Sequence, residues 1–368
     1  MFATRFAVER RGIERVPDTE RRGRPLGLGL MWSGVILNVQ VVVYGALLVG
    51  FKLNWWQCLL AIVLGNLTWV IAGLASLAGP AAGTTTFTVS RAPFGINGNR
   101  PVAFFNWLQQ VGYEVVSLAM MVLASVALLK LAGVEVSGVG KLGLVLGLAV
   151  LQSVLPVIGH AAITRVLHLL ILPFAALFCA LAVLTADRLD PHSAAFTTPA
   201  GWPAFLGGLA LSVSVAGLSW APNGPDYSRY LPEGSSRASV VAAVTLGGAI
   251  PQIVLMSVGA SAAMVITGAS DPISGLPTAF PLWFVLPYFA LVITQLTMLN
   301  AIDLYSSGVT LQAIGLRIGR WQAVALDGAV CAVAGLVVAY SGDFTTLLGN
   351  FLLFMVVWFA PWAAIFIV

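Results

Sequence analysis

Near its middle the chain reads Gly217-Leu218-Ser219-Trp220-Ala221-Pro222-Asn223-Gly224-Pro225-Asp226-Tyr227, inside a stretch otherwise apolar enough to cross a bilayer. Two glycines and two prolines interrupt the helix that such a stretch would form. In lipid, a broken helix leaves backbone groups unpaired, which is tolerated only where protein or a water-filled cavity satisfies them. Such breaks are typical of the binding sites of secondary transporters. Trp220, at the break, offers a flat face to a flat ligand.

The composition indicates a polytopic membrane protein. Hydrophobic residues make up 59% of the chain and charged residues only 9%, whereas about a quarter of a soluble domain is charged. The net charge of +4 does not predict a nucleic-acid partner, because the basic residues form no patch. Cys58, Cys179 and Cys331 are isolated in apolar spans, so they predict neither a metal site nor a disulfide framework.

We expect an all-α fold of about ten apolar spans, each close to the ~20 residues that a bilayer requires. They lie near residues 30–50, 55–78, 104–131, 142–159, 164–186, 204–222, 238–268, 281–314, 322–340 and 344–368. Span 1 holds the amides Asn38 and Gln40 in its middle, and burying them without partners costs a few kcal/mol each. Spans 1 and 6 are five apart, which predicts two inverted five-helix repeats (30–186 and 204–368) with broken helices at matching positions. In the alternative interpretation, Asn38 and Gln40 only hold helices together.

The basic residues predict the orientation. Fourteen of them fall on the side of the N-terminus and four on the other, so residues 1–29 are expected to form a cytoplasmic, arginine-rich tail of a cell (plasma or inner) membrane protein. This start has no apolar core and is not a signal peptide. The segment 79–101, rich in Gly, Thr and Pro, predicts a cytoplasmic or partly re-entrant loop. The chain stops inside an apolar run, which suggests a truncated product.

Three acids, Glu114, Asp303 and Asp327, lie in apolar spans. An ionisable residue at the bilayer centre costs at least ~2.5 kcal/mol and indicates function by default. Glu114 and Asp303 lie in spans 3 and 8, and two carboxylates facing one cavity would repel, which favours a proton on one of them. The alternative is a structural hydrogen bond to a helix break. For Asp327, beside Arg320 at the start of span 9, we expect a structural, interfacial role.

Four stretches together resemble the nucleobase:cation symporter family, in its purine–cytosine permease branch, whose substrates include cytosine, purines, uracil, thiamine and allantoin. The most specific is Ser219-Trp220-Ala221-Pro222 followed by Asp226-Tyr227-Ser228-Arg229-Tyr230-Leu231-Pro232. The others are Met31-Trp32 leading to Asn38, Gly112-Tyr113-Glu114-Val115-Val116, and Asn300 leading to Tyr305-Ser306-Ser307-Gly308. Their order and spacing are similar to the family's from about residue 20 to the end.

This resemblance implies two inverted five-helix repeats and alternating access, in which a bundle of spans 1, 2, 6 and 7 moves against a scaffold of spans 3, 4, 8 and 9. The family usually adds two further spans. The resemblance also implies a flat substrate held between aromatic groups of spans 3 and 6, with amides of spans 1, 3 and 8 reading its edge.

Carried over by position, Trp220 matches the stacking tryptophan and Tyr113 stands where relatives often have Trp. Ser117 and Asp303 stand where amides are common. The resemblance and the break together predict a substrate site of Asn38, Gln40, Tyr113, Glu114, Ser117, Ser219, Trp220, Asn300 and Asp303. An acid at position 303 suits adjacent donors, such as the amino group and ring N–H of an aminopyrimidine or purine, better than a pyrimidinedione.

The coupling ion is expected to be H⁺ or Na⁺, and no other cofactor is expected. In sodium-coupled relatives span 8 hydroxyls help to bind Na⁺, but Met298 and Leu299 stand near those positions here and Thr297 is close. This weak supply of hydroxyls favours a proton carried by Glu114 or Asp303, with Thr297 as the sodium alternative.

The leading hypothesis is a secondary importer of cytosine or a related base. The alternatives are an importer of another small heterocycle (allantoin, a hydantoin or a thiamine-like ring) and a transport-inactive sensor or truncated paralogue. No metal cluster, nucleophile–base pair or cofactor motif favours an enzyme.

Overall fold

The computed structural model describes residues 8–266, 273, 275, 279–341 and 357–368, and these residues form helices and connecting segments without a strand. The helices are α1 Pro25–Ile36, α2 Val39–Val49, α3 Trp55–Asn66, α4 Trp69–Ala75, α5 Ala78–Ala82, α6 Thr86–Val89, α7 Arg91–Leu131, α8 Gly138–Ile158, α9 His160–Ala186, α10 Ala194–Thr197, α11 Trp202–Val215, α12 Gly217–Trp220, the 3₁₀ turn η2 Ala221–Asn223, α13 Gly224–Ser228, α14 Arg237–Val265, α15 Leu282–Ile314 and α16 Arg320–Ser341.

Over the described residues, eight helical segments are long and apolar enough to cross a membrane, and α1 with α2 forms a ninth if this bent pair is one span. The all-helical polytopic class predicted from the sequence is thus confirmed. The predicted tenth span, 344–368, lies largely outside the described residues, and its described part holds the short apolar helix Val357–Ile367.

Span 1 is broken at Leu37 and Asn38, where α1 and α2 meet at 59°. Asn38 has an extended backbone, and its side-chain oxygen accepts a hydrogen bond from Val41 N at 3.3 Å, so it caps the start of α2. Its amide Nδ2 donates to Val35 O at 2.7 Å, a carbonyl near the end of α1. One asparagine therefore satisfies backbone groups on both sides of the break.

Span 6 is broken in the segment that the sequence indicated. Helix α11 ends at Val215, Ala216 is extended, and the chain continues through α12, η2 and α13. Gln252 of α14 donates from Nε2 to the freed Val215 O at 2.7 Å and accepts from Trp69 Nε1 at 2.7 Å. A neighbouring span thus supplies the hydrogen bond that the broken helix lacks, as a membrane interior requires.

The segment 79–101, predicted as a loop, is largely helical, so that prediction was wrong. It contains α5, α6 and the first turns of α7. The glycines and prolines divide the segment rather than unfolding it: Gly95, at φ 69°, kinks α7 near its start, and Pro101 lies inside the same helix. Pro and Gly are tolerated inside membrane helices because neighbouring groups satisfy the freed backbone.

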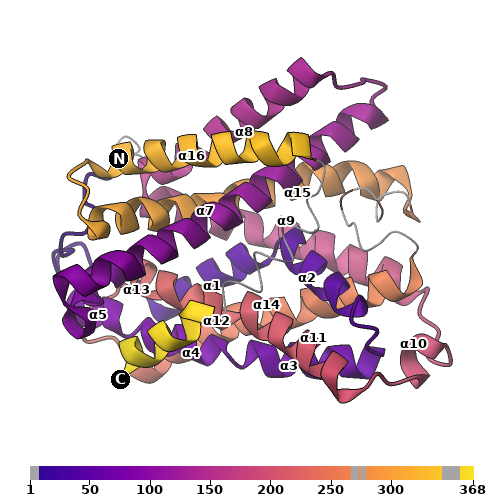
Figure 1. Ribbon diagram of the computed structural model, residues 1–368, viewed down its shortest axis with the longest axis horizontal. Helices are drawn as coiled ribbons and strands as arrows, with labels where there is room; N and C mark the ends of the chain where they lie inside the picture. The colour runs from indigo at the N-terminus through magenta and orange to yellow at the C-terminus, as the bar shows by residue number, and fades with distance from the viewer. Residues whose placement is uncertain (1–7, 267–272, 274, 276–278, 342–356) are drawn as a thin grey trace.

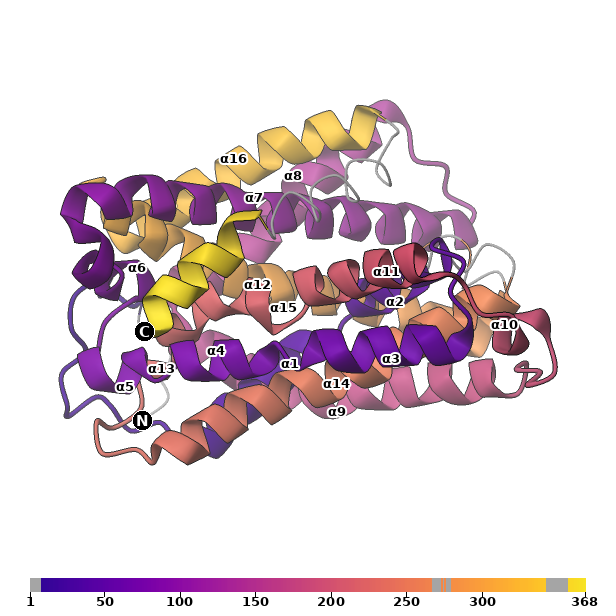
Figure 2. The same ribbon diagram turned by 60° about the horizontal axis from the view of Figure 1, so that its bottom comes forward.

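The spans pack in two groups. Helices α7, α8, α15 and α16 contact one another and lie together in the upper part of Figure 1, whereas α14 packs against α1, α2, α3 and α4 in the lower part of Figures 1 and 2. We call the first group the scaffold and the second, with α11–α13, the bundle. The grouping follows the division implied by the resemblance, and both broken spans belong to the bundle.

Both halves of span 1 touch α14 at glycines. A Cβ on Gly45 of α2 would lie 1.9 Å from Met256 O, and one on Gly247 of α14 would lie 2.4 Å from Gly29 O of α1. Only glycine permits such close approach of two helix backbones. The bent span therefore packs closely against α14 on both sides of its break.

Candidate functional site

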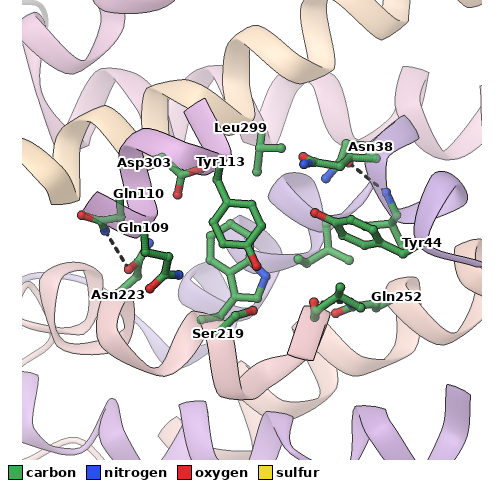
Figure 3. Close-up of a pocket in the computed structure, with 15 residues that line it drawn as sticks. Asn38, Tyr44, Gln109, Gln110, Tyr113, Ser219, Asn223, Gln252, Leu299 and Asp303 are labelled. Atoms are coloured by element: carbon green, nitrogen blue, oxygen red, sulfur yellow. Dashed lines mark hydrogen bonds between the residues drawn. The ribbon is translucent and has the colours of Figure 1, made fainter. Parts of the chain in front are cut away.

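A small pocket, with a cavity volume of about 30 Å³, lies between the two helix breaks. Its walls come from both breaks, from α7 and α15 of the scaffold and from α14 (Figure 3). The lining residues are Ile36, Asn38, Gln40, Val41, Tyr44, Gln109, Gln110, Tyr113, Val215, Ser219, Trp220, Asn223, Gln252, Leu299 and Asp303.

Three aromatic side chains line the pocket, Tyr113 from the scaffold and Tyr44 and Trp220 from the bundle. Tyr113 of α7 extends across it toward Ser219 at the span 6 break (Figure 3). Trp220 is half-buried and is held by Trp32, whose ring meets it edge-on at 5.5 Å, and by Trp69, whose ring is stacked at 6.5 Å. The indole is thus fixed in orientation before any ligand arrives.

Buried amides in the pocket have hydrogen-bonding atoms to spare. Gln40 accepts from Ser117 Oγ at 3.3 Å, which leaves its Nε2 without a partner among the described residues. The Oε1 atoms of Gln109 and Gln110 are also buried without a partner in the described part of the chain. Because unpaired buried polar groups are costly, these atoms indicate a ligand that pairs with them.

Asn223 connects the two groups at the edge of the pocket. Its Oδ1 accepts a hydrogen bond from Gln110 Nε2 at 3.0 Å (Figure 3). Asp303 of α15 lines the same pocket. The hydrogen bond between Gln110 of α7 and Asn223 of the broken span 6 thus joins the scaffold to the bundle at the pocket.

The pocket brings together six of the predicted substrate residues: Asn38, Gln40, Tyr113, Ser219, Trp220 and Asp303. The other predicted residues, Glu114, Ser117, Asn300 and Thr297, do not line it. Ser117 lies behind Gln40, to which it donates. Thr297 donates to Ile293 O at 2.8 Å, in the preceding turn of its own helix.

Glu114 and Asn300 point into the scaffold. Glu114 follows Tyr113 by one residue, which turns its side chain by about 100° around α7. Asn300 donates to the Glu114 carbonyl at 2.9 Å and to Gln152 Oε1 at 2.7 Å. Its contacts tie α15 to α7 and α8.

The interfacial placement expected for Asp327 was wrong. Asp327 is fully buried and accepts from Trp107 Nε1 at 2.7 Å. The neighbouring Arg320 instead donates to carbonyls at the end of α8, Pro156 O and Val157 O, both at 2.5 Å. Arg320 and Asp327 are seven residues apart, so about two helical turns separate their side chains and each has different partners.

Sequence reasoning missed five polar residues of the pocket: Tyr44, Gln109, Gln110, Asn223 and Gln252. A signal for some of them was present. Gln109 and Gln110 precede Tyr113 by four and three residues, so they share its side of the helix. Both are amides inside an apolar span, the same feature that singled out Asn38 and Gln40.

A small-molecule pocket at two helix breaks, between two groups of membrane spans, defines a secondary transporter. The chain belongs to the family of permeases for cytosine/purines, uracil, thiamine and allantoin, whose model matches residues 15–368.

Similar proteins agree with this class. YxlA of Bacillus subtilis (strain 168), described as a candidate purine-cytosine permease, is 27% identical over 97% of this chain and 78% of its own length. Among solved structures, the nucleobase-cation-symport-1 transporter Mhp1, closed with bromovinylhydantoin bound, has a TM-score of 0.81 at 18% identity, over 97% of this chain and 80% of its own. Its inward-facing conformation has a TM-score of 0.76 at 18% identity, over 98% and 80%. The predicted fold of two inverted repeats is thus confirmed.

Proposed function

We propose that the protein is a secondary active importer of a nucleobase, cytosine or a related purine or pyrimidine, coupled to H⁺ or Na⁺. The observation that carries this proposal is the pocket itself. It combines two aromatic rings, from Tyr113 and Trp220, with spare amide donors and acceptors and one carboxyl group, from Asp303. Flat rings with polar edges are the ligands that such a pocket suits, because aromatic stacking holds the faces and hydrogen bonds read the edge.

The polar atoms favour a base that carries both donors and acceptors. Among the described residues, Gln40 Nε2 is a donor without a partner, whereas Gln109 Oε1 and Gln110 Oε1 are acceptors without one. The Asp303 carboxyl group adds acceptors for adjacent N–H groups. The amino group and ring nitrogens of cytosine or an aminopurine would use all three kinds of partner.

Alternating access is the mechanism we propose, with the bundle moving against the scaffold. The pocket lies between these groups, and the Gln110–Asn223 hydrogen bond crosses from one to the other. Mhp1, with the same fold, has been solved both closed and inward-facing. We further propose that the N-terminus lies in the cytoplasm, that the protein resides in the plasma or inner membrane, and that the repeats cover residues 30–186 and 204–368.

A second candidate substrate is a hydantoin, allantoin or another small heterocycle. The bound bromovinylhydantoin of Mhp1 supports this alternative. A hydantoin ring has N–H donors but lacks the exocyclic amino group that the Asp303 carboxyl group would accept from, so we place it second.

The test is counterflow in proteoliposomes. Vesicles loaded with unlabelled cytosine should accumulate labelled cytosine without any ion gradient, and adenine, guanine, uracil, allantoin and hydantoin should compete according to their affinity. Imposed Na⁺ or pH gradients then identify the ion. If none of these heterocycles supports counterflow, the proposed substrate class is wrong.

A further inference from the structure

We propose that Glu114 and Asp327 form a buried proton-binding site inside the scaffold, behind the substrate pocket, and that the proton they share is the coupling ion. The proposal deepens the function proposed above: the claim that the proton is the coupling ion rests on the protein being an importer. The existence of the shared proton is a separate claim that can be tested without any substrate.

The two acids meet on a single hydroxyl group. Ser307 Oγ of α15 lies 3.0 Å from Glu114 Oε1 of α7 and also contacts Asp327 Oδ2 of α16. Both carboxyl groups are fully buried, with no exposed surface. Three scaffold helices thus converge on one point, and each contributes one of the three side chains.

Counting hydrogens shows that the cluster needs an added proton. A serine hydroxyl has one hydrogen, so it can donate to only one of the two carboxyl groups. The other contact joins two oxygen atoms, and it is attractive only if that carboxyl is protonated and donates to Ser307 Oγ. With both acids ionised, the second contact would set a carboxylate against the serine lone pairs. The geometry therefore fits a pair of acids that holds at least one proton.

The described residues around the pair supply no positive charge to replace that proton. Within the described residues, no Lys, Arg or His is hydrogen-bonded to either carboxyl group or forms an ion pair with one. The titratable groups that face the pair are Asp303 on α15 and Cys331 on α16, and neither is a cation. From α8 the facing side chain is the neutral Gln152, which contacts Cys331 Sγ at 3.4 Å.

One oxygen atom of the pair is left over. Glu114 Oε2 is buried and has no hydrogen-bond partner among the residues that the structure describes. A buried carboxylate group with an unpaired oxygen is costly, whereas a proton on Glu114 Oε1, donated to Ser307 Oγ, removes the charge. Glu114 is therefore the member of the pair on which the proton would be added or withdrawn.

Glu114 and Ser307, which form part of the acid cluster, lie on the same helices as the pocket residues Tyr113 and Asp303. Glu114 is the direct neighbour of Tyr113, and Ser307 lies one helical turn after Asp303 on α15. Asn300, one turn before Asp303, donates to the Glu114 carbonyl. A change of charge on the pair thus acts on the same two helices that carry the pocket's tyrosine and acid.

Two conservative variants test the site. Glu114→Gln and Asp327→Asn keep the size of each side chain, and each amide N–H₂ can donate to Ser307 as a protonated acid would. Glu135→Gln, at an exposed position between α7 and α8, is the matched control. All four proteins are purified intact, and counterflow confirms that each is folded and functional.

The first measurement is the infrared carbonyl band of a protonated carboxylic acid, recorded without substrate. We expect this band at neutral pH in the wild type and in Glu135→Gln, and its reduction in both pair variants. A spectrum without the band, or one unchanged in both variants, would overturn the proton site.

The second measurement is proton entry with substrate, followed by a pH dye trapped inside proteoliposomes. Glu114→Gln and Asp327→Asn should keep counterflow but lose substrate-driven proton entry. Above the titration range of the pair, the wild-type Kd should rise about tenfold per pH unit, and the variants should show no such rise. Proton entry at the wild-type level in both variants would show that the pair is not the coupling site, whereas a wild type without counterflow would instead refute the importer.

Discussion

The side-chain amide of Gln110 donates a hydrogen bond to Asn223 Oδ1 at 3.0 Å, and this bond joins a scaffold helix to the broken span 6 at the edge of the pocket. Both side chains are almost fully buried. In an alternating-access transporter, a contact that crosses between the moving groups is present only while the groups are together. The bond is thus a stabilising feature of the closed pocket.

We expect Gln110→Ala to open the pocket more often. Losing one buried hydrogen bond should disfavour the closed form by about 0.5–1.5 kcal/mol, and it should weaken substrate binding by a few-fold. Gln109→Ala is the control, because Gln109 lines the pocket without bonding Asn223. Reactivity of a cysteine placed at Ser219 reports opening. It should rise in Gln110→Ala only, and equal reactivity in both variants would contradict a closing role for this bond.

Trp220→Ala should weaken substrate binding by about 1–3 kcal/mol, the amount that base stacking on an aromatic ring contributes elsewhere. Trp220→Phe should restore part of this loss. Substrate Kd is measured by equilibrium binding to purified protein. Trp202→Ala, at an exposed position at the start of α11, should leave Kd unchanged. An unaltered Kd in Trp220→Ala would refute the stacking role.

Asp303→Asn should change which base is preferred. The carboxyl group accepts from the exocyclic amino group of cytosine but would face a carbonyl at that position of uracil, so the variant should lose more affinity for cytosine than for uracil. Competition against labelled cytosine and labelled uracil gives the two ratios. Equal losses for both bases would mean that Asp303 does not read the edge of the ring.

Glu9, in the segment before α1, should make stability depend on pH. Burial raises its pKa, but the Arg229 guanidinium at 3.7 Å and a hydrogen bond from Tyr230 lower it more, so the net pKa is below its usual value. A lowered pKa means that the stabilisation is complete above the unfolded-state value and is lost as pH falls through the folded-state value.

Glu9→Gln should therefore lower the free energy of unfolding at neutral pH by about 1–3 kcal/mol, because Arg229 is fully buried and would lose its charged partner. Melting temperatures of the purified variant and wild type should converge as the medium is acidified. Glu233→Gln, an exposed acid whose nearest basic group lies at 3.8 Å, is the control and should melt as the wild type does. A Glu9→Gln difference that is constant with pH would exclude the ionised pair as its cause.

The sequence predicted the breaks well because a bilayer leaves few ways to satisfy a broken helix. Gly and Pro in span 6, with the amide Asn38 in span 1, pointed to the two places where the structure bends. The sequence predicted less well which side of its helix each side chain lies on. Helix α15 is buried continuously from Gln295 to Leu311 and carries polar residues on several sides, so its pattern does not distinguish Asp303, in the pocket, from Asn300, in the scaffold. The same limitation hid Gln109 and Gln110, and it placed Glu114 beside the substrate.

The close approach of Gly45 and Gly247 to their partners determines what the bend in span 1 can do. Since α1 and α2 each rest on the backbone of α14, the 59° angle between them is braced from outside and cannot flex without parting two helices. The bend is therefore a fixed angle, and any motion that exposes the pocket must carry α1, α2 and α14 together.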